Sequence, residues 1–290
     1  MKISIITVCK NSQNHIEKSI QSVISQTYKN IEYIIIDGAS DDKTCEIINK
    51  YKNHIHAFKS EPDHSLYEAM NKGLRLASGD FLYFLNSDDY IFDERVISDV
   101  VNFITKNPKS EFIYGNCQTR SPLGILSVYE PVEPKKILDE MLILGDFPIQ
   151  AASFFKAELF TRFGNFSENY RIASDYEWYT RILNAQNVYL FYYPRIISSF
   201  YRGGLSSDFR KVFPEVWAIQ DKALVYQTDY WKKQRVIKLQ ELIIKTEQLT
   251  KEANLLAANR QNIINVISIF NQSFNRIYQS NKFNLNNRNN

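Results

Sequence analysis

Short apolar segments alternate with helix-like segments through the first hundred residues, and this alternation limits the folds open to the chain. Segments with the length and composition of buried strands lie at residues 3–8, 31–36, 55–59 and 81–85. Segments with apolar side chains at helical spacing lie between them, at residues 15–26, 44–51, 65–77 and 94–106. The third of these begins with a capping-box pattern from Ser65 to Glu68. The alternation predicts an α/β fold with a doubly wound, mostly parallel sheet.

Polar residues follow three of these strands, at residues 7–11, 37–42 and 86–89. Right-handed crossovers bring the carboxyl ends of parallel strands to one edge of a sheet. Open α/β sheets bind ligands at that edge, so the three loops predict a cleft for a small ligand.

The segment from residue 81 to 89 carries the clearest chemical signal, because five apolar residues run directly into Asn86, Ser87, Asp88 and Asp89. These side chains offer hard oxygen donors without sulfur or imidazole. Such a set suits Mg²⁺ or Mn²⁺ carrying a phosphate group better than zinc. The alternative is an acidic turn that caps the next helix, since Asp and Asn are common in such turns.

The rest of the chain has a different pattern. Prolines separate shorter segments, of which residues 152–155 and 188–192 are typical of strands and 174–184 of a helix. We expect this mixed half to form the second wall of the cleft. From residue 215 onward there is no Gly or Pro, and apolar positions at steps of three and four predict a long amphipathic helix, or a pair, over 239–277.

Composition narrows the class of partner and the compartment. Of the 290 residues 44% are hydrophobic, and a net charge of +3 gives no signal for binding nucleic acid. Residues 215–290 form the basic part, with 11 Lys and Arg against 6 Asp and Glu. Three widely spaced cysteines fit neither a zinc site nor a disulfide framework. We expect no signal peptide and no spanning helix, hence a cytoplasmic protein, with peripheral contact at the inner face of the membrane left open.

Five segments, at residues 3–11, 34–42, 61–73, 77–89 and 173–178, together resemble glycosyltransferase family 2. The likeness is greatest to bacterial members that build surface polysaccharides, and it covers about residues 1–205. It implies a GT-A fold, in which a nucleotide-binding α/β half is joined to an acceptor half. It also implies an inverting transferase that moves a sugar from a nucleotide-diphosphate donor to a hydroxyl of a glycan or polyprenyl-linked acceptor. A UDP-sugar is the expected donor.

With this resemblance we expect a GT-A domain over 1–214, divided into a nucleotide-binding half at about 1–107 and an acceptor half at about 108–214. A helical extension over 215–290 would follow, with a disordered, Asn-rich end. The extension could pack on the domain, pair with a second copy, or contact an anionic membrane. Packing or self-association is the simpler of these and is favoured.

The resemblance also assigns roles to single residues. Asn86-Ser87-Asp88 corresponds to the Asp-x-Asp element of the family, whose last carboxylate, here Asp88, would coordinate Mn²⁺ or Mg²⁺. Asp175 corresponds to the catalytic base, which would take the proton of the acceptor hydroxyl. Asp37 would contact the base or ribose, and Arg202 would pair with phosphate oxygens. The full set implied to border the donor is Thr7, Lys10, Asn11, Asp37, Asp63, Asn86 and Arg202.

Two positions depart from the family pattern, because Asn86 stands where Asp is usual and Ser174 where Glu is usual. An amide oxygen can still face a cation or a ribose hydroxyl, but it brings no charge.

Three of the proposed site residues could instead have no role in binding or catalysis. Asp37 could simply form a turn, Asp175 could be an acid in the first turn of a helix, and Lys10 could be a solvated surface residue.

Other functions are less consistent with the sequence. A dehydrogenase would need a glycine-rich fingerprint after the first strand, and residues 7–11 contain no glycine. A sugar-phosphate nucleotidyltransferase is the closest enzymatic alternative, although it too would ordinarily need a Gly-rich, basic loop there. The alternative outside enzymes is a non-catalytic nucleotide-sugar-binding module, for which Asn86 is the support.

Overall fold

The computed structural model describes residues 1–144, 147–185 and 187–241, together with 244, 247, 248, 251, 252, 254 and 255. Backbone contacts divide the chain into two units, Met1–Lys232 and Lys233–Asn290. The expected boundary after residue 214 falls inside helix α8 (Phe209–Lys222), which belongs to the first unit. Residues 229–241 are helical. Most of the amphipathic helix expected over 239–277, and all of the Asn-rich end, lie outside the described residues.

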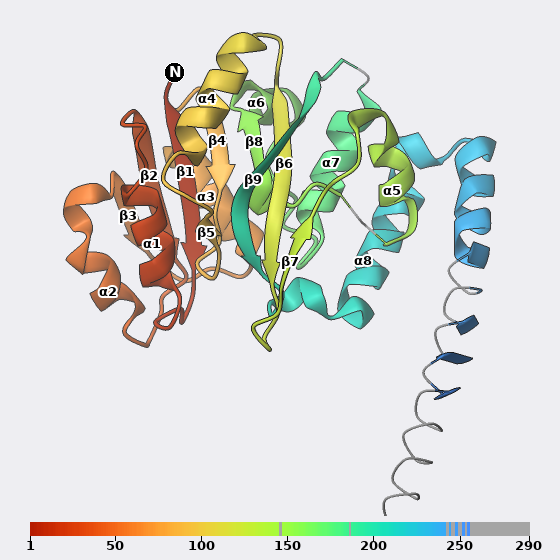
Figure 1. The fold of residues 1–290 in the computed structure, drawn as a ribbon, viewed down its shortest axis with the longest axis horizontal. Helices are drawn as coiled ribbons and strands as arrows, with labels where there is room; N and C mark the ends of the chain where they lie inside the picture. Colours follow the sequence, from red (N-terminus) through yellow and green to blue (C-terminus); the bar gives the residue numbers. More distant parts are fainter. Residues whose placement is uncertain are drawn as a thin grey trace, which may run out of the picture. The chain divides into compact units, whose positions relative to one another are not determined.

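Four parallel strands form the first half of the sheet. They are β1 (Ile3–Cys9), β2 (Ile31–Asp37), β3 (Ala57–Ser60) and β4 (Phe81–Phe84), drawn in red to orange in Figure 1. β1 lies between β2 and β4, with Ile3 opposite both Ile31 and Phe81. Because these strands are parallel, the loops after β1, β2 and β4 leave the sheet at one edge, as the sequence predicts.

Five further strands, four of them from the half at about 108–214, extend the same sheet. They are β5 (Tyr90–Ile91), β6 (Phe112–Arg120), β7 (Leu126–Tyr129), β8 (Ser153–Lys156) and β9 (Leu190–Tyr201). Within the described residues the nine strands have the order β3-β2-β1-β4-β8-β6-β9-β5, with β7 beside β6. β8 runs antiparallel to both β4 and β6, whereas β6 and β9 are parallel. The acceptor-side half is therefore mixed, as expected.

Four of these strands differ from the sequence-based expectation. The strand expected at 188–192 is only the start of β9, which continues to Tyr201, and β5, β6 and β7 were not expected at all. The register between β6 and β9 shifts beside Gly115, where Tyr193 and then Ile196 are paired. Pro194 lies in this irregular stretch and donates no hydrogen bond to the ladder, so the strand passes a residue that would ordinarily end it.

Helices cover both faces of the sheet. One face packs against α1 (Ile16–Ile24), α2 (Thr44–Lys50) and α4 (Val96–Lys106), of which α1 and α4 lie nearest the viewer in Figure 1. The other face packs against α3 (Leu66–Leu76), α5 (Ile137–Leu144), α6 (Glu158–Phe163), α7 (Ser174–Asn184) and α8. Side chains of β1 alternate between the two cores, with Ile5 in one and Ile6 in the other. The doubly wound α/β fold is thus confirmed.

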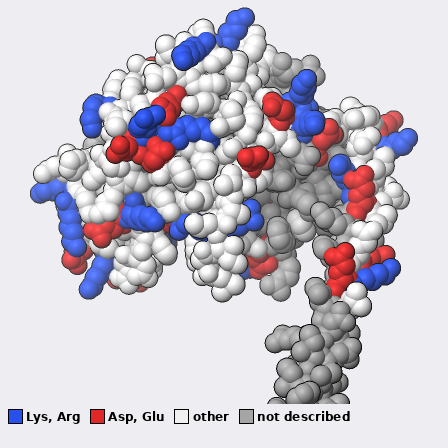
Figure 2. All heavy atoms as spheres, viewed as in Figure 1, with Lys and Arg blue, Asp and Glu red and all other residues white. Residues whose placement is uncertain are grey.

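Three-residue 3-10 turns complete the described elements, at Lys52–His54, Pro134–Lys136, Gln150–Ala152, Leu205–Ser207 and Leu224–Tyr226. None of the helices in the described part of the chain has the length and apolar character needed to span a bilayer. On the face shown in Figure 2, Lys and Arg side chains are interspersed with Asp and Glu.

The capping box at the start of α3 forms with a shift of one residue. The Ser65 hydroxyl accepts a hydrogen bond from the Glu68 N–H at 3.1 Å, as expected for a cap. The Glu68 carboxylate accepts from the N–H of His64 at 2.7 Å, rather than from that of Ser65. This pair of bonds orders the loop that leads into α3.

Candidate active site

The loops after β1 and β2 are joined by Asn11. Its N–H donates to the Ser40 hydroxyl at 2.8 Å, and its side-chain oxygen accepts from the Asp41 N–H at 3.0 Å. Asn11 and Ala39 have φ angles of 51° and 55°, in the left-handed region that non-glycine residues seldom occupy. Such backbone persists only where surrounding bonds hold it, and it is common at ligand sites.

Asp37 is fully buried beneath these loops. Its carboxylate accepts from the N–H of Ser40 at 2.9 Å, from the Ser60 hydroxyl at 2.7 Å and from the thiol of Cys45 at 3.3 Å. Burial opposes its ionisation, but these hydrogen bonds outweigh burial and hold the pKa of Asp37 below its ordinary value. The side chain thus supports the turn. A contact between this carboxylate and a nucleotide would compete with bonds that already exist.

Asp63 and Lys10 lie beside the same turn. A Cβ built on Gly38 would be 2.3 Å from Oδ2 of Asp63, so the carboxylate packs directly against the glycine. Burial raises the pKa of Asp63, and the positive charge of Lys10 opposes this rise. Thr7 differs from its expected neighbours because its side chain is buried and accepts a hydrogen bond from the Tyr33 hydroxyl at 3.2 Å. The Thr7 hydroxyl therefore faces the core.

The loop after β4 is held from three directions. The Ser87 hydroxyl is 2.8 Å from the Ser12 hydroxyl, which connects this loop to the one after β1. Arg120 on β6 donates to the backbone carbonyl of Asp88 at 2.6 Å. The carboxylate of Asp89 accepts from the N–H of Tyr201 at 2.8 Å, which connects the loop to the end of β9.

Arg202 directly follows β9. Its backbone N–H donates to the carbonyl of Arg120 at 2.8 Å, and its side chain is exposed. Arg202 is thus connected through Arg120 to the loop that contains Asp88. Gly204 lies close by, since a Cβ there would be 3.9 Å from Oδ2 of Asp88.

Asp88 and its neighbours fit a hard cation. Burial raises the pKa of Asp88, with partial opposition from His15 and Arg120, so its ionised form lacks full compensation within the protein. Two other buried oxygens, Oδ1 of Asn86 and Oδ2 of Asp89, have no hydrogen-bond partner among the described residues. The described part of the chain contains no group of three His, Cys, Asp or Glu side chains that could hold a metal ion without a bound ligand. A cation at Asp88 would therefore need oxygens from a bound ligand.

Asp175 lies in the first turn of α7, where the sequence places it. Its Oδ1 accepts hydrogen bonds from the Tyr67 hydroxyl and from the N–H of Tyr176, both at 2.8 Å. Burial raises the pKa of Asp175 to about 6, although the bond from Tyr67 acts in the opposite direction. A carboxyl group with this pKa is largely ionised at neutral pH and still basic enough to accept a proton. Ser174, where the family usually has Glu, is buried and donates to the carbonyl of Ser167 at 2.6 Å.

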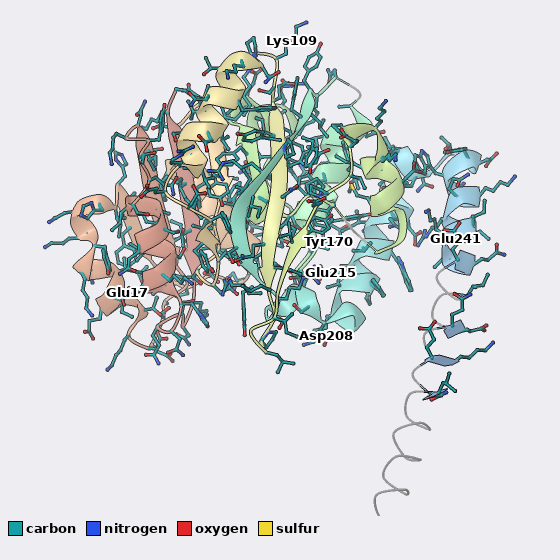
Figure 3. All side chains as sticks on the ribbon, in the orientation of Figure 1. Glu17, Lys109, Tyr170, Asp208, Glu215 and Glu241 are labelled. Carbon is teal, nitrogen blue, oxygen red and sulfur yellow. The ribbon has the colours of Figure 1, made fainter. Side chains whose placement is uncertain are left out.

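Three residues of the site were missed by sequence analysis: Tyr67, Arg120 and Glu215. Tyr67 belongs to a segment that resembles the family, but nothing local connects it to a residue more than a hundred positions away. Glu215, labelled on α8 in Figure 3, accepts N–H bonds from the residues just before α7. It was missed because the expected domain ended at residue 214. Arg120 lies in β6, one of the strands that were not expected.

The site residues thus fall into three groups. Lys10, Asn11, Asp37 and Asp63 surround the loops after β1 and β2. Asp88 and Arg202 each form a hydrogen bond with Arg120, and Asn86 lies in the same loop as Asp88. Asp175 lies with Tyr67 and Glu215 at the start of α7, where three helices contribute to its surroundings.

Comparison with known proteins gives a consistent picture. The sequence profile described as "Glycosyl transferase family 2" matches residues 4–125. An uncharacterized glycosyltransferase of Mycobacterium tuberculosis is 31% identical over 188 residues, which cover 62% of this chain and 68% of that protein. A PGL/p-HBAD biosynthesis glycosyltransferase of Mycobacterium bovis is 25% identical over 240 residues, or 79% of this chain and 91% of its own.

Solved structures bear on the fold alone. S. aureus TarS 1–349 in complex with UDP-GlcNAc has a TM-score of 0.60 and 20% identity, over 79% of this chain and 68% of that one. A mannosyltransferase from Pyrobaculum calidifontis, in complex with GDP-Man and Mn²⁺, has a TM-score of 0.53 and 16% identity, over 83% and 64%. Against a longer TarS chain the match covers 40% of that chain. These similarities confirm the expected GT-A-like architecture.

Proposed function

The chain belongs to glycosyltransferase family 2, and we propose that it transfers a sugar from a nucleotide-diphosphate donor to a hydroxyl group, with inversion at the anomeric carbon. The acceptor is a glycan or a lipid-linked glycan of a surface-polysaccharide or glycolipid pathway. A relative named for PGL/p-HBAD biosynthesis supports this class of product. A UDP-sugar is the proposed donor, and a structural neighbour bound to UDP-GlcNAc supports that choice.

The observation that carries the proposal is the environment of Asp175. Its Oδ1 is engaged by Tyr67 and by the Tyr176 N–H, and Oδ2 is the oxygen proposed to face the acceptor. As the acceptor oxygen attacks the anomeric carbon, its O–H bond breaks and the proton passes to Oδ2. The bond from the anomeric carbon to the diphosphate breaks on the opposite side, and its electron pair leaves with the nucleotide. A pKa of about 6 suits Asp175 to accept that proton at neutral pH.

The donor would lie along the loops after β1, β2 and β4. Lys10, Asn11 and Asp63 are proposed to border the nucleotide, and the exposed Arg202 is proposed to pair with the diphosphate. Asp88, with the Asn86 amide oxygen beside it, would hold Mn²⁺ or Mg²⁺ together with diphosphate oxygens. A bound cation of this kind would neutralise the charge that develops on the leaving diphosphate.

The test measures release of nucleoside diphosphate from a panel of UDP- and GDP-sugars in the presence of Mn²⁺ and a hydroxyl acceptor. Asp175→Asn should bind the donor normally and lose transfer by about 10²–10⁴-fold, because a general base contributes that much. Asp88→Ala should instead weaken donor binding only when Mn²⁺ is present. Asp229→Asn removes an exposed carboxylate outside the site and is the matched control.

Three outcomes contradict the proposal. Full transfer by Asp175→Asn would rule out Asp175 as the base. Unchanged metal dependence in Asp88→Ala would rule out Asp88 as the metal ligand. Release of pyrophosphate in place of a nucleoside diphosphate would identify a nucleotidyltransferase.

A further inference from the structure

Glu215 holds the backbone that leads into the proposed base. One carboxylate oxygen, Oε1, accepts from the N–H of Arg171, while Oε2 accepts from those of Ile172 and Ala173, each at 2.9 Å. These three residues directly precede α7, and the last of them, Ala173, is its N-cap residue. Glu215 comes from α8, more than forty positions later, and Figure 3 labels it near Tyr170, just ahead of the segment that it holds.

Tyr67 approaches the same segment from α3. Its side chain is buried, and its hydroxyl lies 2.6 Å from the carbonyl oxygen of Ile172 and 2.8 Å from Oδ1 of Asp175. A tyrosine hydroxyl carries one proton, so it can donate fully to only one of these acceptors at a time. The hydroxyl therefore links the position of the carboxylate to that of the backbone before it.

Glu215 and Tyr67 contact the same short segment before and at the start of α7, but they bind different groups of it. Glu215 takes up N–H groups of residues 171–173, and Tyr67 engages the carbonyl of Ile172 and the carboxylate of Asp175. The hydrogen bonds that Tyr67 and the Tyr176 N–H donate to this carboxylate both end on Oδ1. Holding Oδ1 in this way also fixes the direction in which Oδ2 points.

Resting on the proposed role of Asp175, we propose that Tyr67 and Glu215 are positioning residues that orient the Asp175 carboxylate so that Oδ2 meets the acceptor hydroxyl. Neither residue touches the reacting atoms. A positioning error of even about 1 Å lowers the rate of such a transfer strongly, so the effect falls on kcat. The KM for the donor should be unaffected, because the donor lies along other loops.

The two residues also act on the ionisation of Asp175, in opposite directions. The hydrogen bond from Tyr67 stabilises the carboxylate and lowers its pKa, while the negative charge of Glu215 raises it. Tyr179 on α7 is a further titratable group that interacts with Asp175, and it is buried. A purely structural role for Tyr67 and Glu215 would change stability without moving the ionisation of the base.

The experiment compares pH profiles of kcat for the full chain and its variants. Because the base must be ionised, kcat falls as the pH drops through the pKa of Asp175. Tyr67→Phe removes a bond to the ionised form and should move this acid limb to higher pH by roughly half to one unit. Glu215→Gln removes a negative charge and should move it to lower pH, with kcat about tenfold lower. The donor KM should remain within about twofold in both.

Matched controls separate position from charge. Glu215→Asp keeps the charge but shortens the side chain, so it should lower kcat and leave the acid limb in place. Tyr230→Phe removes a hydroxyl from an exposed ring, and Glu158→Gln removes an exposed charge; both should behave as the unmodified chain. If Glu215→Gln does not fold, Tyr67→Phe and Glu215→Asp decide the question.

Opposite shifts of the acid limb support the positioning pair. The proposed roles of Tyr67 and Glu215 would be overturned if the acid limb of the kcat profile did not move in Tyr67→Phe and Glu215→Gln, or if it moved in the same direction in both. A failure of the proposed function is distinguishable, since Asp175→Asn would then retain transfer. If Asp175→Asn is inactive and the acid limb moves in neither Tyr67→Phe nor Glu215→Gln, Asp175 remains the proposed base and the positioning role of Tyr67 and Glu215 is rejected.

Discussion

Asp175 should destabilise the folded protein at the pH where it works. Burial raises its pKa from an ordinary value of 3.8 to about 6, a difference of about two units. One unit corresponds to about 1.4 kcal/mol, so ionising this carboxyl costs the folded state about 3 kcal/mol relative to the unfolded chain. Asparagine keeps an oxygen that can accept from Tyr67 and the Tyr176 N–H, and it carries no charge. We therefore expect Asp175→Asn to raise the free energy of unfolding by up to about 3 kcal/mol at pH 8.

The direction of the pH dependence follows from the raised pKa. Below the ordinary value of 3.8 the carboxyl is protonated in both the folded and the unfolded chain, so it imposes no penalty. Between there and about pH 6 the unfolded chain loses its proton first, and the folded state becomes progressively less favoured. The difference between the unmodified chain and Asp175→Asn should thus be small near pH 4 and complete by pH 8.

Urea unfolding followed by circular dichroism at these two pH values measures the effect. Asp229→Asn, which removes an exposed carboxylate, should show no comparable gain. If Asp175→Asn is less stable than the unmodified chain at pH 8, or if its free energy of unfolding rises equally at both pH values, burial does not disfavour ionisation of Asp175. A protein that becomes more stable as it loses transfer would fit a base held at the expense of stability.

Two further predictions concern the loops of the site. Ser65→Ala removes the side-chain acceptor for the Glu68 N–H and should lower the free energy of unfolding by about 1 kcal/mol, measured by urea titration; no loss would mean that the Glu68 bond to His64 suffices alone. Gly38→Ala places a methyl group 2.3 Å from Oδ2 of Asp63, so the carboxylate must move. Calorimetric titration should then show that UDP binds roughly tenfold more weakly. An unchanged affinity for UDP would show that Asp63 does not border the nucleotide.

The parallel half of the fold could be predicted because its signals are local. Each of β1, β2 and β4 is an apolar run followed by a polar loop, and this pattern alone indicates a buried strand that ends at the ligand edge. β6 and β9 carry no such signal. Polar residues such as Asn116 and Gln118 lie within β6, and Pro194 lies within β9. Their extended conformation depends on pairing with each other, across about eighty positions of sequence.

The site shows the same division. Asp88 and Asp175 could be proposed as site residues from the sequence because each lies in a segment that resembles the family. Thr7, identified in the same way, has its hydroxyl directed to Tyr33 in the core, since a segment match does not say which way a side chain turns. Tyr67 and Glu215 could not be found, because their contacts with the start of α7 exist only once three helices have packed together.

The position of Glu215 on α8 has a consequence for how such proteins diversify. The loops proposed to hold the donor are built between residues 3 and 89, whereas the helix that carries Glu215, the residue proposed to orient the base, starts at residue 209. On these proposals, substitutions on α8 would change proton transfer to the acceptor without disturbing nucleotide recognition. Exchange of α8 between related chains would then be an engineering route to altered acceptor preference.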